Sequence, residues 1–340
     1  MDSTNFKTGW GNLDYSVPES PASKLLGNSP DNILKPTSVR KVAFSIGNYF
    51  LTAGNVIPKN LAVEISPLLL NGKASLNDYN KNKFWYRLRF SLGTNIVSNG
   101  GYNVAEGLRL TVIDKTDLRD FRCNPDFINF LYKSAINNSV AHDKAFADYA
   151  TKHSSTPINV SEQYFKDKKF KHLFDSLYAN DFVDIDAVSG YRDSIRNLLW
   201  NAPIWELGIA TLQSSSDSLL KNLKFSQIGF WSTTGIAIGK KGQLLIGCKV
   251  ALVDSVQWQT TVSIGERLFY GTNNIKGFLQ AQYDYKNKRS GFTASLGCQF
   301  NIANGLWGEF SINLVIDGNG KLSYQPGFNI GLGTPEKKKM

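Results

Sequence analysis

The stretch GFTASLGCQFNIANGLWGEFSINLVIDGNGKLSYQPGFNIGLG, residues 291–333, alternates apolar and polar residues in three segments that the turn sequences ANG and DGNG separate. Alternation with a period of two over about a dozen residues predicts β-strands. One face of these predicted strands holds Gly, Ser, Thr, Asn and Gln, together with Glu309. The other face is apolar and consists of Phe292, Ala294, Leu296, Cys298, Phe300, Leu306, Phe310, Ile312, Leu314, Leu322, Tyr324, Phe328, Ile330 and Leu332.

The fold class follows from the length and chemistry of these strands. A soluble sandwich turns its apolar face inward, whereas a membrane barrel turns it to lipid and encloses the polar face. The segments match the length of about 9–11 residues that a tilted transmembrane strand needs. Apart from Glu309, their polar face consists of Gly, Ser, Thr, Asn and Gln rather than the Lys and Glu of a solvated sheet. We therefore expect an all-β chain with a helical insertion, folded as an antiparallel transmembrane β-barrel.

Similar alternation recurs elsewhere in the chain. It is clear in LAVEIS at residues 61–66, KFWYRLRFSLGTNIVS at 83–98, NVAEGLRLTVID at 103–114 and several segments within 202–286. About eleven strands result from this pattern. Residues 41–50 fit either a helix or a strand, and because single-chain bacterial barrels have an even number of strands, about twelve strands are expected.

The pattern divides the chain into five parts. Residues 1–40 are rich in Ser, Pro, Asn and Gly and predict an irregular N-terminal arm or plug. Barrel strands are expected over residues 41–114 and 200–333, and residues 334–340 form a basic tail. Residues 115–199 space aromatic residues and Leu by three and four positions, which predicts helices. This helical insertion is far longer than an ordinary loop, and we expect it to cap or plug one mouth of the barrel.

Charged residues also occur on the polar side of the predicted strands. Enclosed charges must pair or stay hydrated, because burying one alone costs several kcal/mol. We expect pairing that holds the lumen together, with a wet, mildly cationic pore as the alternative. The predicted lumen-facing residues are Glu64, Arg87, Arg89, Arg109, Glu206, Lys249, Arg267 and Glu309.

No nucleic-acid partner is expected, although the net charge is +10. Nucleic-acid binding needs basic residues clustered on one element with stacking aromatic residues between them. The nearest approach is Lys166, Lys168, Lys169 and Lys171, which Asp167 interrupts. A solvated helix face explains this run.

Catalysis, metals and cofactors are not predicted either. The three histidines, His142, His153 and His172, all lie within the helical insertion, so a Ser-His site on a barrel wall is excluded. Their spacings fit no metal motif. The three cysteines, Cys123, Cys248 and Cys298, show no metal-ligand spacing and predict no structural disulfide. We expect a protein that is not an enzyme and has no cofactor.

The segments PASKLLGNSPDNILKPTSVRKVAFSI and NLAVEISPLLL carry a resemblance to a known family. Together they resemble the N-terminal region of uncharacterised, barrel-like outer-membrane envelope proteins of Gram-negative bacteria of the Bacteroidetes type. This resemblance implies the outer membrane as location and the lipid bilayer as partner, without a defined activity. The chain departs from the family in opening without a signal peptide. The matching positions are Pro21, Ala22, Leu26, Gly27, Pro36, Thr37, Arg40, Glu64 and Pro67.

The leading functional hypothesis is an outer-membrane β-barrel with a structural or porin-like transport role, whose helical insertion is available to bind another envelope protein. One alternative is a soluble β-sheet protein that acts as a binding or assembly subunit of a larger complex. A second alternative is an organellar barrel of mitochondrial type. The last predicted strand favours it, because Gln325, Gly327, Ile330 and Leu332 resemble the insertion signal of such barrels.

Overall fold

The structure, a computed structural model, describes residues 17–27, 33–35, 61–70, 75–96, 100–153, 155–178, 185–254, 258–286, 288–303 and 306–332. Eleven strands form one sheet in which each strand pairs antiparallel with its neighbours in sequence. The expected all-β class with additional helices is confirmed. The strands are β1 (Ala62–Ile65), β2 (Leu88–Ile96), β3 (Tyr102–Asp114), β4 (Ile204–Ser215), β5 (Lys224–Ile238), β6 (Gly242–Val253), β7 (Gln259–Gly271), β8 (Ile275–Lys286), β9 (Arg289–Ala303), β10 (Leu306–Ile316) and β11 (Leu322–Leu332).

Helices interrupt the strand sequence at several places. The α-helices are α1 (Pro21–Leu26), α3 (Leu76–Lys81), α4 (Lys83–Arg87), α5 (Pro125–Lys152), α6 (Pro157–Lys166), α7 (Lys168–Leu177) and α8 (Ile185–Leu198). Short 3-10 helices are η3 (Pro67–Leu70) and η4 (Leu220–Asn222). No helix in the described ranges has both the length and the apolar character needed to cross a membrane.

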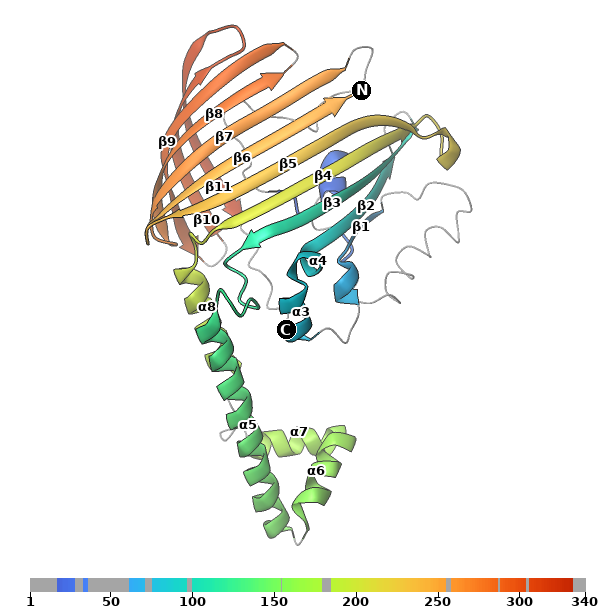
Figure 1. Ribbon diagram of the computed structural model, residues 1–340, viewed down its shortest axis with the longest axis vertical. Helices are drawn as coiled ribbons and strands as arrows, with labels where there is room; N and C mark the ends of the chain where they lie inside the picture. Colours follow the sequence, from blue (N-terminus) through green and yellow to red (C-terminus); the bar gives the residue numbers. More distant parts are fainter. Residues whose placement is uncertain are drawn as a thin grey trace. The chain divides into compact units, whose positions relative to one another are not determined.

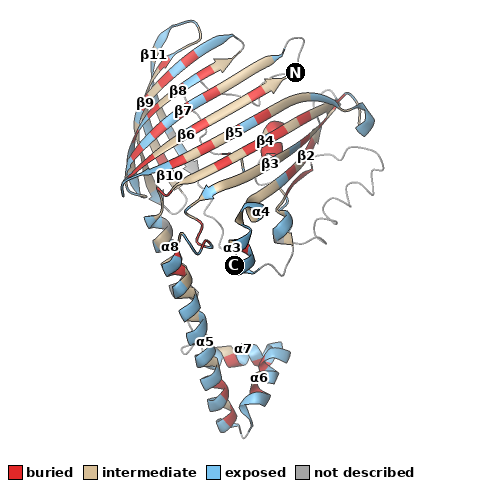
Figure 2. Cartoon of the chain, viewed as in Figure 1, coloured by how far each residue is buried: buried red, intermediate tan, exposed pale blue. Residues whose placement is uncertain are grey.

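The two faces of the sheet differ in chemistry and in exposure, and burial alternates along the strands (Figure 2). On β7, Ser263 is 0% exposed while its neighbour Ile264 is 46% exposed. On β9, Thr293 is 0% exposed and Leu296 is 59% exposed. We name the first side the polar face and the second the apolar face. The register places on the polar face Glu64, Arg109, Glu206, Lys249, Ser263, Arg267, Gln282, Thr293 and Asn313.

The sheet is not closed into a barrel in the described part of the chain, where β1 and β11 are its two edges. Because each pair of neighbours is antiparallel, these two edge strands run in the same direction. The outer edge of β1 is bonded in parallel by Leu34, whose N–H donates to Ala62 O at 2.8 Å and whose carbonyl accepts from Glu64 N at 2.9 Å. The possible twelfth strand over residues 41–50 lies outside the described residues.

The predicted strand over residues 83–98 is wrong at its start, where Lys83–Arg87 form α4. Aromatic residues at alternate positions there match the pattern of a strand. The backbone nevertheless turns helical after Asn82, whose carbonyl accepts the N–H groups of Trp85 and Tyr86 at 3.1 and 3.3 Å. Local hydrogen bonding at this helix start outweighs the apolar alternation.

The predicted irregular arm over residues 1–40 is wrong for Pro21–Leu26, which form α1. Ser20 caps this helix by accepting a hydrogen bond from Ser23 N. Gly27 ends it in the left-handed region, at φ 72°, which glycine adopts without the steric penalty of a Cβ atom. A helix of only six residues is unstable in isolation, so packing against the sheet must stabilise α1.

Residues Asp117–Leu199 form a compact unit of their own, which contains α5, α6, α7 and α8. Tyr164 belongs to the aromatic core of this unit, and its hydroxyl donates to Asp175 Oδ1 at 2.8 Å. Burial, together with this bond to the carboxylate, raises the pKa of Tyr164 to about 12. The buried core residues are Ala145, Phe146, Ala150, Val160, Tyr164, Phe170 and Phe174.

Deletion of the helical unit should leave the sheet folded. The strands that flank it, β3 and β4, are already paired where the unit begins, with Asp114 opposite Ile204 and Lys115 N donating to Pro203 O at 3.0 Å. A short Gly/Asn turn in place of residues 117–199 can therefore join them as a hairpin. We expect the β signal in far-ultraviolet circular dichroism to persist in the deletion variant. Loss of that signal would show that the sheet depends on the helices.

Candidate functional site on the polar face

Helix α1 packs on the polar face of the curved sheet (Figure 1), where glycines leave room for it. A Cβ atom on Gly93 would lie 2.5 Å from Leu26 Cδ1, and one on Gly107 would lie 3.0 Å from Ala22 N. A side chain at Gly93 would displace the end of the Leu26 side chain, whereas one at Gly107 would press on the backbone of α1 itself. The four glycines that face this segment are Gly93, Gly107, Gly208 and Gly229.

Apolar packing and hydrogen bonds together hold α1 on the sheet. Ser91 Oγ accepts from Ala22 N at 3.2 Å, and Asn95 Nδ2 donates to Leu26 O at 2.9 Å. These contacts satisfy backbone groups that a helix terminus leaves without an internal partner. The buried apolar cluster between helix and sheet consists of Val17, Ala22, Leu25, Leu26, Ala105, Ala210, Leu212, Trp231 and Ala251.

The segments on the two sides of α1 form a charge pair. Glu19 and Lys35 form an ion pair whose side chains are 59% and 37% exposed. The hydrogen bond from Lys35, reinforced by the positive charges of Arg109 and Arg89, lowers the pKa of Glu19 below its ordinary value. The charge of Glu19 and those of Arg89 and Arg109 on the polar face therefore influence each other.

Two ion pairs lie on the polar face of β1–β4. Arg89 Nη1 is 2.7 Å from Glu64 Oε1, and the Glu64 side chain is only 3% exposed. Arg109 Nη2 is 2.7 Å from Glu206 Oε1, which also accepts from Thr111 Oγ1 at 2.9 Å. Arg89 and Arg109 are directly opposite each other on β2 and β3, so the two glutamates offset the repulsion between them.

A third ion pair connects β7 with β10 through Arg267. Arg267 Nη1 is 3.1 Å from Glu309 Oε2, and the two side chains are 10% and 15% exposed. Arg267 Nε donates to Gln280 Oε1 at 2.7 Å, and Gln299 donates to Glu309. The guanidinium also lies over the Phe278 ring, 4.3 Å from its centre. Arg267 is therefore held by an acid, an amide and an aromatic ring at once.

An aromatic cage surrounds the ammonium group of Lys276 at the start of β8. Its Nζ lies 4.7 Å from the centre of the Phe269 ring, 5.0 Å from that of Trp200 and 5.4 Å from that of Trp307. Cation–π attraction at such distances stabilises a partly desolvated cation. The cage links β7, β8 and β10 to Trp200, the residue at which the chain re-enters the sheet unit after the helices.

Of the two remaining predicted lumen-facing residues, Lys249 lies in a strand of the sheet and Arg87 lies in a helix. Lys249 lies on the polar face, directly opposite Trp231 on β5 and Ser263 on β7. Arg87 is a correction, because it belongs to α4 rather than to a strand. Its Nε donates to the hydroxyl of Tyr79 at 3.0 Å. Because the chain is helical before β2, Arg87 is not one of the strand residues that the sequence predicted to face the lumen.

The sequence reasoning missed a row of polar residues on β8. Gln280, Gln282 and Asp284 are 4%, 1% and 4% exposed, and all three face the polar side. They occupy alternate positions in the segment FLQAQYDY, so the strand pattern contained the signal. The predicted set contained only Arg, Lys and Glu residues, so it did not include these two amides and the aspartate.

Two of the three histidines of the helical unit, His142 and His153, pack against aromatic rings. The ring centres of His142 and Tyr164 are 5.4 Å apart, and those of His153 and Tyr149 are 3.9 Å apart. Burial lowers the pKa of His142. Within the described ranges, no group of three His, Cys, Asp or Glu side chains is placed to hold a metal ion.

The polar face therefore combines three Arg–Glu pairs with amides, hydroxyls and a docked helix. Comparison of the chain with protein-family models, curated proteins and solved structures found no significant match. Within the described residues, the three glutamates of these pairs are therefore neutralised by arginines of the same face.

Proposed function

We propose that this protein is a membrane protein whose sheet meets lipid with its apolar face, in the manner of a transmembrane β-barrel. The observation that supports it is the inverted burial of the sheet, in which polar side chains are buried and large apolar ones are exposed. Soluble monomers rarely expose contiguous apolar patches larger than a few hundred Å². Lipid-facing strands of a barrel have this pattern. The outer membrane of a Gram-negative bacterium is the location that the resemblance of residues 21–70 implies.

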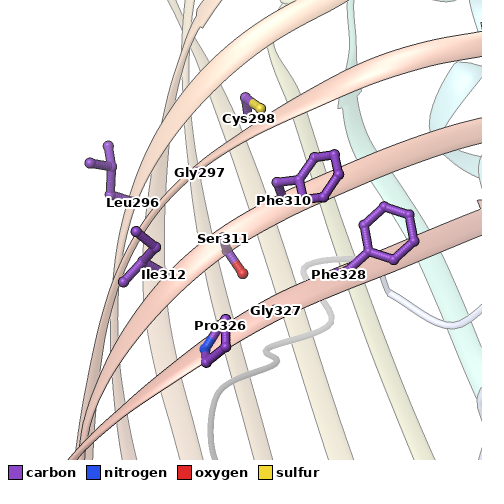
Figure 3. A pocket seen from close by; sticks show the side chains of 9 residues that line it. All are labelled: Leu296, Gly297, Cys298, Phe310, Ser311, Ile312, Pro326, Gly327 and Phe328. Carbon is purple, nitrogen blue, oxygen red and sulfur yellow. The ribbon is translucent and has the colours of Figure 1, made fainter.

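A depression of about 620 Å³ on β9–β11 illustrates this apolar surface (Figure 3). Leu296, Ile312, Phe310 and Phe328 line it, and they are between 50% and 65% exposed. Cys298 also lines the depression as a free thiol. An acyl chain of a lipid would cover these side chains without any polar group to satisfy.

A membrane position also requires both sheet edges to be paired. An unpaired backbone N–H or C=O group in lipid costs several kcal/mol, and open sheet edges do not occur there. Because β1 and β11 run in the same direction, direct pairing between them would be parallel, and one strand inserted between them would make both contacts antiparallel. Leu34 already bonds to the outer edge of β1. The proposal thus includes a further backbone partner for β11.

The contents of the polar face favour a structural role over a permanently open pore. Three ion pairs neutralise glutamates and arginines there, and α1 occupies the face of β2–β4 with a buried apolar cluster. Transport through such a lumen would require α1 to leave its position. The helical unit is the surface we propose for a protein partner, because Ile158 and Phe165 on α6 are 71% and 76% exposed.

A second candidate is a sheet protein whose apolar face packs against a partner protein instead of lipid. Two carboxylates on that face favour it. Glu106 lies between Leu92 and Thr211 in the register, and Glu266 lies between Ile246 and Ala281. Charged side chains in contact with lipid destabilise a barrel, by an amount that falls toward the membrane surface. Glu106 accepts hydrogen bonds from Thr211 Oγ1 at 3.2 Å and Gln213 Nε2 at 3.3 Å, and a polar protein surface would accommodate its charge better than lipid would.

Fluorophores at Ile312 and at its neighbour Asn313 separate the two candidates. These residues point to opposite faces of β10. Each fluorophore is attached to a cysteine introduced at one of the two positions, after the native cysteines have been replaced. In lipid vesicles we expect strong quenching by lipid-borne quenchers at position 312 and weak quenching at position 313. Equal, weak quenching at both positions would exclude lipid contact of the apolar face and support the protein-bound alternative.

A further inference from the structure

Four buried oxygens on β7, β8 and β9 have no hydrogen-bond partner other than one another in the part of the chain that the structure describes. They are Ser263 Oγ, Asp284 Oδ1, Thr293 Oγ1 and Ser295 Oγ. Asp284 is 4% exposed, and both Ser263 and Thr293 are 0% exposed. Buried polar groups in native proteins are satisfied by protein, water or a ligand. These oxygens therefore point to a group that occupies the space between them.

The strand register brings these side chains together around Asp284. Ser263 is directly opposite Asp284 in the β7–β8 pair, and Thr293 is opposite Gln282 in the β8–β9 pair. Thr293 is thus a diagonal neighbour of Asp284 on the same face, at a typical Cα separation of about 7–8 Å. Ser295 follows Thr293 at the next position of that face. Two strands consequently present hydroxyl groups to one carboxylate.

A directed chain of hydrogen bonds holds the other oxygen of this carboxylate. Arg267 Nε donates to Gln280 Oε1 at 2.7 Å, Gln280 Nε2 donates to Gln282 Oε1 at 3.3 Å, and Gln282 Nε2 donates to Asp284 Oδ2 at 2.7 Å. Every bond in this chain donates toward Asp284. This chain occupies Oδ2 of Asp284 and leaves Oδ1 available to a further partner.

We propose that Asp284, Ser263 and Thr293 form a binding site for a small monovalent cation of the sodium class. Carboxylate and hydroxyl oxygens are hard ligands, which suit hard cations. A divalent ion is disfavoured, because the site holds one carboxylate and has Lys249 opposite Ser263 and Arg267 at the other end of the hydrogen-bond chain. A monovalent ion would neutralise Asp284 without leaving excess positive charge. The site depends on the polar face alone and is independent of whether lipid or protein covers the apolar face.

The test is the thermal unfolding midpoint of the full chain, measured in choline chloride and in sodium chloride at equal ionic strength. A ligand that binds only the folded state raises the midpoint, and at about ten times its dissociation constant we expect a rise of roughly 2–4 °C. Asp284→Asn preserves the shape of the side chain and should abolish this rise. Ser263→Ala and Thr293→Val keep the charge and should shift the rise to higher sodium concentration.

Glu206→Gln is the matched control, because Glu206 is a buried acid of the same face that is paired with Arg109. Its sodium-dependent rise should equal that of the unaltered chain. Broadening of the sodium nuclear magnetic resonance line by the unaltered chain, and its loss in Asp284→Asn, gives a second readout that does not involve unfolding. Equal midpoints in both salts would overturn the proposal and assign the unpaired oxygens to ordered water. A sodium response that survives in Asp284→Asn would overturn it as well.

Discussion

Replacement of Arg267 by Met should lower the free energy of unfolding by about 3–5 kcal/mol, which is typical of removing one partner from a buried ion pair. Glu309 would lose the ion pair at 3.1 Å and remain largely buried, with its side chain 15% exposed. Gln280 would lose its donor, and the contact with the Phe278 ring would change from cation–π to apolar packing. Equilibrium denaturation, in the medium that keeps the chain dispersed, measures this difference.

The matched control for this prediction is Arg289→Met on strand β9. Arg289 is exposed at the start of its strand, so the same chemical change there should alter the free energy of unfolding by no more than about 0.5 kcal/mol. The double variant Arg267→Met/Glu309→Leu should recover much of the loss, because it removes both charges of the pair together. A similar loss for Arg267→Met and Arg289→Met would contradict the role given to the Arg267 network.

Ile264→Lys should destabilise the protein by about 2–4 kcal/mol when the sheet is embedded in lipid, the amount that a lysine at the midplane of a barrel costs. Ile264 lies on the apolar face of β7 and is 46% exposed. If water covers this face instead, an exposed isoleucine can be replaced by lysine with a change within about 0.5 kcal/mol. Equilibrium unfolding in lipid vesicles gives the value, and the two environments predict clearly different results.

Leu220→Lys provides the control for the lipid prediction. Leu220 is 39% exposed but belongs to η4, in the connection between β4 and β5 rather than in a strand. It should tolerate lysine in vesicles with little change in stability. A loss at position 264 no larger than the loss at position 220 would show that the apolar face of β7 does not contact lipid.

Most of the sheet was predictable because strand alternation is a local property. Residues such as Val262 and Ile264 recur with a period of two, and the structure places them on one face of β7. The same pattern failed at Lys83–Arg87, where helical hydrogen bonds compete with alternation over a segment of five residues. It also missed α1, since a helix of six residues has too few positions to show a period of 3.6.

The candidate site was predictable in its composition but not in its pairing. The alternation of side chains along each strand indicates which charged residues share its polar side. It places Glu64, Glu206 and Glu309 there. Their partners depend on strand register across segments far apart in the chain. Arg109 and Glu206, for example, are separated by 97 positions, and the helical unit lies between them. No local pattern carries that information.

The residues alone establish strands, their two chemically different faces and the helical character of the segment between β3 and β4, because each depends on neighbours within a few positions. Three-dimensional packing settles everything that depends on distant neighbours. It decides that Ser263, which parity places on the polar face, is fully buried, and that α1 rests on glycines of that face. It also decides that the polar side is the buried one. The reason is that burial is set by what covers a face, and the covering groups come from other parts of the chain.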